Sequence, residues 1–406
     1  MTNYKTNTLC PLPWIHLSSH LDSTMRICCN TDHSGFIKSN DGNTIKLSEI
    51  ENINEYFNVD EYKEIRKKML NGQRPKICNK CYEIEDAGGL SVRQGYLQRH
   101  SKDESFNKQI SSTLGNGSIN VEVKSLDLSL SNKCNLKCIM CNPAASLPIK
   151  QDFEKLNIEY DVHFTEGASK NWNDSGPIEN ITEQISHSLR QYLTTGGEPF
   201  LSKIHLKTLK VLTQNNTASN ISLQYHTNCT IRNDELFEIW NEFKEVDVHF
   251  SIDSIGILDE YIRFNSNWKT IENNVLLMLE HKKVRAEVHS CIQVLNIFNL
   301  TEIYDWILKL EKPNLPSFPF HIWMDQPKWL HIDILPKHLK EKAADKLLNY
   351  FAQYRGEKGA LFRERSQQIL SYLERSINTP QDLEGLNLFK KSCLLYTSDA
   401  ADDSLR

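Results

Sequence analysis

Three cysteines in one short segment constrain this chain of 406 residues more than any other feature of its sequence. Cys134, Cys138 and Cys141 have the spacing CxxxCxxC, which brings three thiolates within reach of one metal cluster. A four-iron cluster with three protein ligands keeps one iron open, whereas electron-transfer clusters take all four ligands from the chain. An open iron can bind a substrate or a cosubstrate. The segment therefore indicates chemistry rather than a structural metal site.

A second motif follows the apolar, strand-like stretch that ends at Thr195. Residues 196 to 199 read Gly-Gly-Glu-Pro, and glycines at such a turn allow positive φ and close approach of the backbone to a ligand. The cysteine loop and this turn, in this order, resemble the two motifs of the radical S-adenosylmethionine (radical SAM) enzymes. The alternative from the residues alone is a structural zinc loop followed by an unrelated turn.

The radical SAM resemblance implies specific roles for both motifs. The open iron of a 4Fe-4S cluster on the three cysteines chelates the amino and carboxylate groups of SAM. The Gly196 and Gly197 backbone and the Glu198 carboxylate, followed by Pro199, bind the SAM ammonium group. One electron from the reduced cluster then cleaves SAM to methionine and a 5'-deoxyadenosyl radical, which abstracts a hydrogen atom from the substrate.

Composition and charge restrict the class of protein. Hydrophobic residues make up 39% of the chain, enough for a large core, and the net charge of -5 gives no general attraction to nucleic acid or to anionic membranes. We find no signal-peptide core in Met1 to Thr8 and no apolar run of membrane-spanning length, so we expect a soluble cytoplasmic protein. Eight of the 11 cysteines precede residue 142 at metal-like spacings, which favours reduced cysteines that ligate iron over disulfides.

The middle of the chain alternates strand-like and helical stretches and predicts an α/β fold. The resemblance implies a partial (β/α)6 radical SAM barrel, in which chemistry lies at the carboxyl ends of the strands. We expect strands at Ser125 to Ser131, Leu189 to Thr195, Ile221 to Thr227, Asp247 to Asp253, Ala286 to Val294 and Pro319 to Met324, and helices at Leu201 to Thr213, Asp234 to Phe243, Trp268 to His281 and Leu300 to Leu310.

A second set of cysteines lies near the N-terminus. Cys78 and Cys81 form a CxxC knuckle, and Cys10 and Cys28 can supply two further thiolates. Four cysteines suit either zinc or an iron-sulfur cluster, and the neighbouring Cys29 is the alternative to Cys28, because adjacent residues in an extended segment point opposite ways.

The N-terminal segment resembles the SPASM/twitch auxiliary-cluster module, which here precedes the barrel. The resemblance implies a small cysteine-rich module with an auxiliary 4Fe-4S cluster, and Glu85, Gly88 or Gly89, Ser91 and Arg93 match its closing positions. This chain departs from the module's pattern at Ser23, next to Asp22, where the module has a glycine. A turn formed by these polar residues can replace the glycine turn.

These features predict the organisation of the whole chain. We expect an auxiliary-cluster module over 1–98, a polar linker over 99–119, the radical SAM core over 120–335 and a helical segment over 336–392, with helices at His338 to Tyr354 and Ala360 to Ser376. Residues 393–406 show no strand or helix period and resemble translated sequencing-adapter read-through.

Within the core, the insertion 142–187 is either a cover for the barrel mouth or a passive surface loop, with irregular chain around Asn171 to Gly176.

Further SAM contacts are implied by resemblance at the strand ends. Asn228 and Ser251 match ribose-side positions, Arg263 matches a position near the SAM carboxylate, and Gln293 and Asn296 match adenine-side positions. Each has a structural alternative, such as a capping role for Asn228. His226, Cys229 and Cys291 fit packed strand residues better than catalysts, and Asp253 also fits a structural role.

The sequence thus predicts a radical SAM enzyme with two 4Fe-4S clusters and SAM as its partner. By family analogy a peptide or protein is the favoured substrate, a carbohydrate or small metabolite is next, and a flavodoxin or ferredoxin is the expected electron donor. The alternatives are a metal-stabilised binding protein without turnover and a radical SAM methyltransferase.

Overall fold

The computed structural model describes residues 7–31, 35–158, 178–324 and 326–391. The fold is α/β, as expected, with an eight-stranded sheet in the order β10-β9-β7-β6-β5-β3-β1-β2. This order has two ends, so the described strands form no closed barrel. The strands are β1 (His16–Ser19), β2 (Met25–Arg26), β3 (Ser125–Ser129), β5 (Gln191–Thr195), β6 (Ser222–Thr227), β7 (Glu245–Ser251), β9 (Val284–Ile292) and β10 (Phe320–Trp323).

All six strands predicted from the sequence are confirmed, to within a few residues at their ends. Strands β5, β6 and β7 alternate between buried and partly exposed residues, as expected for strands with one buried face. The pairs β3–β5, β5–β6 and β9–β10 are parallel, which fits strands joined by helical crossovers. The sequence pattern therefore identified the sheet correctly.

The chain divides into two compact units. The first comprises Met1–Asn135, Asn142–His226 and Ile231–Asp247, and the second comprises Leu136–Cys141, Thr227–Thr230 and Val248–Arg406. Strand β7 begins in the first unit and ends in the second.

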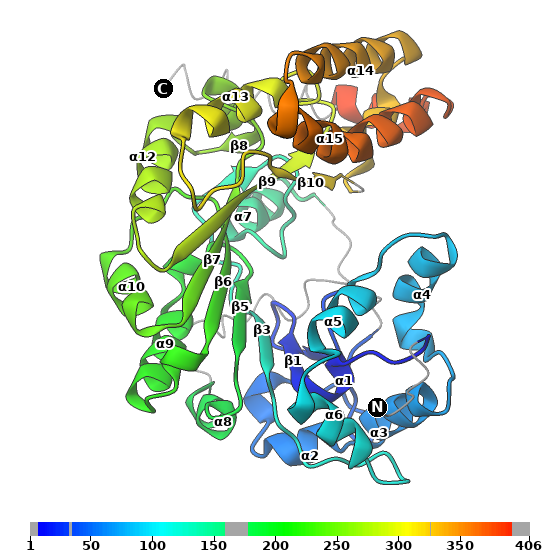
Figure 1. Cartoon of the computed structure of the whole chain (residues 1–406), viewed down its shortest axis with the longest axis vertical. Helices are drawn as coiled ribbons and strands as arrows, with labels where there is room; N and C mark the ends of the chain where they lie inside the picture. Colours follow the sequence, from blue (N-terminus) through cyan, green and yellow to red (C-terminus); the bar gives the residue numbers. More distant parts are fainter. Residues whose placement is uncertain (1–6, 32–34, 159–177, 325, 392–406) are drawn as a thin grey trace. The chain divides into compact units, whose positions relative to one another are not determined.

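In the first unit, the N-terminal segment contributes a strand to the main sheet. Strand β1 lies beside β3 (Figure 1) and pairs with it in parallel. His16 is opposite Ser125 and Ser19 is opposite Leu128, and β2 is antiparallel to β1. The sequence did not reveal β1, because a four-residue strand next to a cysteine motif has too few residues to show a period. The cysteine-rich segment and the first core strand thus share one sheet.

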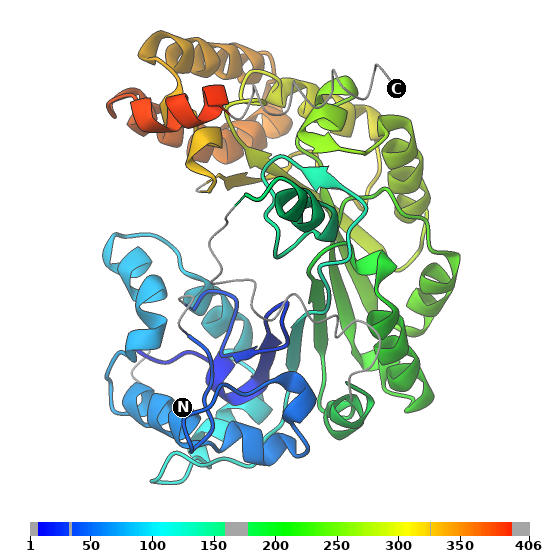
Figure 2. The ribbon, with the colours of Figure 1, turned by 180° about the vertical axis from the view of Figure 1, so that it is seen from behind.

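Helices complete the first unit. Helices α8, α9 and α10 lie along one side of β5 and β6, and the helices of the first hundred residues surround β1 and β2 (Figures 1 and 2). Its helices are α1 (Leu12–Ile15), α2 (Ile53–Phe57), α3 (Asp60–Leu70), α4 (Asn79–Asp86), α5 (Val92–His100), α6 (Glu104–Ser111), α7 (Leu147–Lys155), α8 (Ile178–Ile185), α9 (Lys203–Gln214) and α10 (Asp234–Ile239).

The segment 99–119, expected to be a polar linker, contains helix α6. Phe106 and Ile110 of this helix are buried, and the indole of Trp14 donates a hydrogen bond to Thr113 (2.9 Å). The segment is therefore packed against the N-terminal residues. Its polar composition concealed the two apolar positions that hold it in place.

The second unit contains the last strands and the C-terminal helices. A buried cluster of Ile139, Ile262, Met324 and Leu330 joins its segments. Helices α14 and α15 pack against each other, in agreement with the predicted pair of C-terminal helices (Figures 1 and 2). The helices of this unit are α11 (Ile257–Ile262), α12 (Trp268–Leu279), α13 (Leu300–Leu310), α14 (Lys337–Ala352) and α15 (Gly356–Ile377), and a two-stranded ribbon of β4 (Lys137–Cys138) and β8 (Arg263–Phe264) lies beside them.

Two sequence predictions fall on residues outside the described ranges. These are the irregular chain around Asn171 to Gly176 and the unusual segment 393–406. Among the described helices, none is long and apolar enough to cross a membrane.

Candidate functional site

The Gly-Gly-Glu-Pro turn packs directly against the backbone that leads into the cysteine loop, within the first unit. The Gly197 amide donates to the Ser131 carbonyl (2.5 Å), and the Glu198 amide donates to the Lys133 carbonyl (2.9 Å). Strand residues continue this contact, since the hydroxyl groups of Ser129 and Thr195 are hydrogen-bonded (2.9 Å). Two motifs separated by more than fifty residues in the sequence are therefore joined backbone to backbone.

Both glycines are required at this contact. Gly196 has φ +123°, and a Cβ atom there would lie 2.5 Å from the Ser131 carbonyl oxygen. A Cβ atom on Gly197 would lie 2.3 Å from the Lys133 carbonyl oxygen. Any larger residue at either position would separate the turn from the cysteine loop.

Glu198 and Pro199 form the end of this turn. Glu198 is 2% exposed, and its carboxylate accepts a hydrogen bond from the Phe200 amide (3.2 Å). Pro199 is buried and begins a short 3-10 helix. The turn is thus held rigid on both sides, with a buried carboxylate at its centre.

The cysteine loop itself spans the two units. Cys134 belongs to the first unit, and Cys138 and Cys141 belong to the second. All three are partly buried. Within the second unit, the Cys141 amide donates to the Cys138 carbonyl (2.9 Å), and Cys138 pairs antiparallel with Arg263 in the ribbon of β4 and β8.

Arg263 places a positive charge beside the Cys138 sulfur. Its guanidinium donates to Cys138 Sγ (3.8 Å) and forms an ion pair with the Asp253 carboxylate (2.8 Å), with Asp259 4.0 Å away. Burial raises the pKa of Asp259 to about 7, against the opposing effect of Arg263. A cation next to a sulfur favours the thiolate that a metal needs.

Asp253 also anchors the end of the fifth predicted strand. Its carboxylate accepts from the Cys291 amide (2.7 Å), and the Asn296 amide group donates to the carbonyls of Asp253 and Cys291 (2.8 Å each). Asn296 is therefore engaged in holding this turn. The structural role considered for Asp253 agrees with these contacts.

Gln293 differs from Asn296 in its side chain. It is fully buried, and neither its amide nitrogen nor its amide oxygen has a hydrogen-bond partner among the described residues. An unsatisfied buried amide is costly without a ligand, and it offers one donor and one acceptor to a planar polar ring.

Asn228 and Ser251 lie at the strand ends, as the sequence predicted. The Asn228 side chain accepts from the Thr230 amide (2.9 Å) and hydroxyl (2.6 Å), which closes a local turn. The helix-capping role considered for Asn228 is instead filled by Asn233, the N-cap of α10. Ser251 is the last residue of β7 and is partly exposed. Cys229 is buried with φ +62°, and His226 is the penultimate residue of β6.

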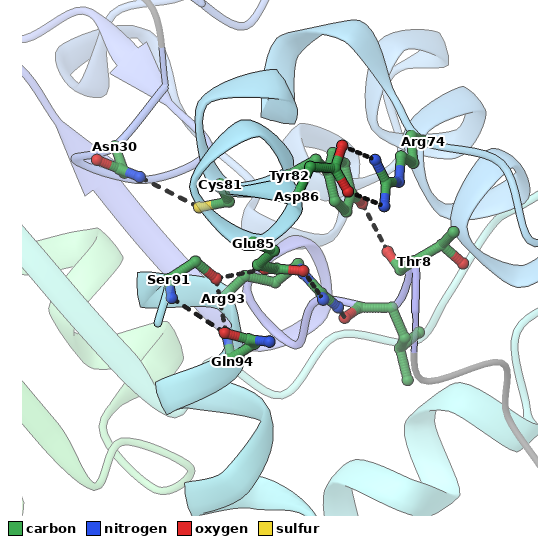
Figure 3. A network of polar contacts seen from close by, with 11 residues as sticks. Thr8, Asn30, Arg74, Cys81, Tyr82, Glu85, Asp86, Ser91, Arg93 and Gln94 are labelled. Carbon is green, nitrogen blue, oxygen red and sulfur yellow. Dashed lines mark hydrogen bonds and ion pairs between the residues drawn. The ribbon is translucent and has the colours of Figure 1, made fainter. Parts of the chain in front are cut away.

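The N-terminal cysteines form a second candidate metal centre, inside the first unit. Burial raises the pKa of Cys10, Cys28 and Cys78, and the negative charges of neighbouring cysteines raise it further. The Asn30 amide group donates to Cys81 Sγ (3.1 Å, Figure 3). Buried thiols that repel one another as thiolates suit a shared metal, because a bound cation removes that penalty.

The structure also distinguishes the two adjacent cysteines. Cys28 is 9% exposed, and Cys10 and Cys81 are among the residues whose charges act on its thiol. Cys29 is exposed, and the charges that act on its thiol most strongly are those of Asp127 and Arg26. These contacts favour Cys28 as the ligand.

A buried ion pair supports the N-terminal centre. Arg93 donates to both oxygens of the Glu85 carboxylate and to the Leu9 carbonyl (2.7 Å), and Ser91 also donates to Glu85 (Figure 3). The Tyr82 hydroxyl donates to the Thr8 carbonyl (2.7 Å). This network joins helices α4 and α5 to the segment that carries Cys10.

Gly88 and Ser23 in this region have positive φ. Gly88 has φ +81° at the end of helix α4. Ser23, which departs from the auxiliary-module pattern, has φ +69°, and Asp22 next to it accepts from the Thr24 amide (3.0 Å). The position keeps a left-handed conformation without glycine because the aspartate closes the turn.

Sequence reasoning did not find the pairing of Asp253 with Arg263, because these residues meet only through the fold. It also did not single out His249 and His289, two stacked histidines of the second unit. Their signal in the sequence is a histidine in the middle of each of two strands, which is weak by itself.

No family model matches this chain. The chain is 25% identical to a GTP 3',8-cyclase of Desulforamulus reducens over 176 residues, which cover 41% of this chain and 47% of the cyclase. The match thus spans about half the length of that curated relative, and it supports the radical SAM class of enzymes.

The chain also has a weak similarity to solved structures. One is anSMEcpe with bound AdoMet and a Cp18Cys peptide (TM-score 0.40, 17% identity, 57% of this chain and 59% of that chain). Another is Streptococcus suis SuiB bound to the precursor peptide SuiA (TM-score 0.41, 11% identity, 78% of this chain and 66% of that chain).

Proposed function

We propose that this chain is a radical SAM enzyme, which reductively cleaves SAM to a 5'-deoxyadenosyl radical that abstracts hydrogen from a substrate. The observation that carries the proposal is the backbone contact between the Gly-Gly-Glu-Pro turn and the start of the cysteine loop. Its glycines have no room for a Cβ atom, so the two motifs form one structural element. A turn of this shape presents backbone groups to a cationic or polar ligand.

Cys134, Cys138 and Cys141 hold the SAM-binding 4Fe-4S cluster in this proposal, on the strength of their spacing and sulfur chemistry. The cluster supplies the electron and the open iron. Arg263 supports this role, because its guanidinium lies beside the Cys138 sulfur and favours the deprotonated ligand. Its ion pair with Asp253 makes it a positioning residue, so the direct contact with the SAM carboxylate expected from the sequence stays a prediction.

The rest of SAM is bound by the turn and the strand ends. Gly196, Gly197 and Glu198 bind the ammonium group. The buried amide of Gln293 supports an adenine contact, since an adenine edge offers both a donor and an acceptor. Ribose contacts by Asn228 and Ser251 and an adenine-side role for Asn296 remain predictions, and the hydrogen bonds of Asn296 favour a supporting role.

The N-terminal centre carries an auxiliary 4Fe-4S cluster on Cys10, Cys28, Cys78 and Cys81. Their burial, their mutual charge interactions and the ion pair that braces them support a closed metal site. This cluster is expected to exchange an electron with the substrate or to support the substrate-binding surface. We retain the division into module, linker, core and C-terminal helices at 98, 119 and 335 as part of the proposal.

The substrate class is a peptide or protein in this proposal, with a carbohydrate or small metabolite next, and the electron donor is a flavodoxin or ferredoxin. Both rest on family analogy rather than on site residues.

The test is anaerobic reconstitution with iron and sulfide, followed by iron counting and a dithionite assay for 5'-deoxyadenosine. We expect about eight irons per chain from two four-iron clusters, and deoxyadenosine from the parent but not from the Cys134/Cys138/Cys141→Ala variant. About four irons with bound zinc would reassign the N-terminal centre. A fully loaded protein that forms no deoxyadenosine would contradict the enzymatic proposal and favour a binding protein.

A further inference from the structure

A pair of histidines in the second unit has no role in the proposed SAM site. His249 on β7 and His289 on β9 have nearly parallel rings, with centroids 4.1 Å apart and an interplanar angle of 18°. Each offers a ring nitrogen, and these nitrogens lie within 4.8 Å of each other. His249 is partly exposed and His289 is 9% exposed. Two imidazoles at this separation can converge on one metal ion after small side-chain rotations.

Glu287 gives His289 the geometry of a metal ligand. It lies two residues earlier on β9, so both side chains point to the same face of the sheet. Its carboxylate oxygen is 3.1 Å from Nε2 of His289. When Nε2 donates its hydrogen to Glu287, Nδ1 keeps the lone pair, and metal-binding histidines are commonly oriented by such a carboxylate.

The face that carries these side chains is exposed at Phe320, and Cys291 on the same face leads toward Arg263. Phe320 on β10 is directly opposite His289, with ring centroids 4.9 Å apart, and is 47% exposed. Cys291 follows His289 by two residues, about 7 Å along the strand. Burial and the negative charge of Asp253 raise the pKa of its thiol, and the positive charge of Arg263 opposes them. Arg263 in turn contacts Cys138.

We propose that His249 and His289 bind a first-row divalent transition metal such as Zn²⁺, with Glu287 as the positioning residue that orients His289. Imidazole suits Zn²⁺, Ni²⁺, Cu²⁺ and Fe²⁺, and two protein ligands leave coordination positions open. The metal site does not depend on SAM cleavage. Its role, which is to bind an oxygen, nitrogen or sulfur atom of the substrate beside the radical site, rests on the proposed function.

The test uses the full chain with its iron-sulfur clusters reconstituted, washed with a chelator and dialysed against Zn²⁺ without oxygen. We expect about one Zn²⁺ per chain, with zinc X-ray absorption showing nitrogen and oxygen ligands near about 2.0 Å and no sulfur near about 2.3 Å. His249→Ala and His289→Ala are expected to lose this zinc. Glu287→Gln is expected to weaken its affinity roughly tenfold.

His338→Ala is the matched control, because it removes an exposed imidazole on helix α14 and is expected to keep the zinc. Iron content checks the fold of each variant, since none of the substituted residues is a candidate cluster ligand. If a histidine variant does not fold, the ligand distances in the parent still decide between nitrogen and sulfur.

Absence of bound zinc, zinc with sulfur ligands, or zinc unchanged in both histidine variants would overturn the proposal. Measuring deoxyadenosine in the same samples separates the two proposals. Zinc bound through His249 and His289 in a protein that does not cleave SAM would support the metal site and reject only its role beside a radical.

Discussion

The two cysteine sets of this chain are built in different ways. The N-terminal set comes from separate segments between positions 10 and 81, whereas the loop set lies between positions 134 and 141. Cys10, Cys28 and Cys81 are each less than a tenth exposed, while the three loop cysteines are partly buried. Three of the four N-terminal candidate ligands are enclosed by the fold and Cys78 is partly buried, whereas the loop cysteines all lie on one short segment.

The contacts that hold the two sets of cysteines in place also differ. The N-terminal cysteines are braced by the ion pair of Glu85 and Arg93 and by hydrogen bonds to chain segments around Leu9. The loop is held by backbone contacts at its start and by Arg263 at Cys138. In the proposed assignment, side-chain contacts hold the segments of the closed N-terminal centre together, whereas the loop of the open centre is positioned by the neighbouring backbone turn.

The largest effect that tests this comparison is expected from single cysteine substitutions in the two sets. Cys141→Ala should abolish deoxyadenosine formation, because an open-iron cluster needs all three loop ligands. Cys81→Ala should lower the iron content by about half and leave detectable SAM cleavage. The measurement is deoxyadenosine per iron after anaerobic reconstitution, with Cys229→Ala as the control outside both sets. Equal loss of SAM cleavage in Cys141→Ala and Cys81→Ala would break the distinction between an open and a closed centre.

A second prediction concerns the neighbours Cys28 and Cys29. Cys28→Ala should remove roughly four irons, because its thiol is buried near Cys10 and Cys81. Cys29→Ala should retain the full iron content, since Cys29 is exposed and interacts mainly with Asp127 and Arg26. Iron counting on the two variants in parallel decides the ligand, and the reverse pattern would assign Cys29 instead.

A third prediction tests the frame of the closed centre. Glu85→Gln should destabilise the protein by about 2 kcal/mol, because Arg93 loses charged acceptors in a buried setting. Asp86→Asn is the matched control on the next residue, whose partner Arg74 is exposed, and it should leave the free energy of unfolding nearly unchanged. Urea unfolding of the parent and both variants measures the difference.

The Glu85 interaction also has a defined pH dependence. Burial raises the pKa of Glu85, but hydrogen bonds from Arg93 and Ser91 lower it more, so its pKa in the folded protein lies below its ordinary value. The folded state therefore binds fewer protons than the unfolded state. This stabilisation is present above about pH 4.3 and is lost as the pH falls through the folded pKa. Glu85→Gln should remove that part of the pH dependence, and an unchanged acid slope would contradict it.

Much of the fold followed from the sequence, and the exceptions have physical causes. The six core strands were predicted because apolar, strand-like stretches alternate with helical stretches along the chain, and three of them, β5, β6 and β7, also alternate buried and partly exposed positions. Strand β1 and helix α6 were not, because one is four residues long and the other has two apolar positions in a polar segment. The spacing of apolar residues predicts a helix or strand only when the element is long enough for that spacing to repeat.

The candidate site was predicted unevenly for a related reason. Motifs named the cysteines and the Gly-Gly-Glu-Pro turn, since cluster chemistry fixes residue types at fixed spacings. No local pattern shows that Arg263 pairs with Asp253, that the Gln293 amide is buried without a partner among the described residues, or that His249 stacks on His289. His249 and His289 lie on β7 and β9, which become neighbours only in the sheet, and Asp253 meets Arg263 only because helix α11 turns the chain between them.

The smallest effect is expected from a substitution in the backbone turn that contacts the cysteine loop. Gly197→Ala would place a Cβ atom 2.3 Å from the Lys133 carbonyl oxygen, so the turn must move away from the cysteine loop. Overpacking of this kind costs about 1 kcal/mol or more, which corresponds to a roughly fivefold or greater loss of deoxyadenosine formation if the cost falls on SAM binding. Iron content should stay at the parent value, because no cysteine is changed.

Gly95→Ala is the control for that substitution, because a Cβ atom there has no heavy atom within 4 Å and the residue lies inside helix α5. It should leave SAM cleavage unchanged and slightly stabilise the helix. Dependence of the rate on SAM concentration separates the causes: a weaker apparent affinity with full iron places the defect in the SAM-binding turn. Loss of iron in Gly197→Ala would instead mean that the turn supports the cysteine loop itself, and the open centre would then depend on its frame as strongly as the closed one does.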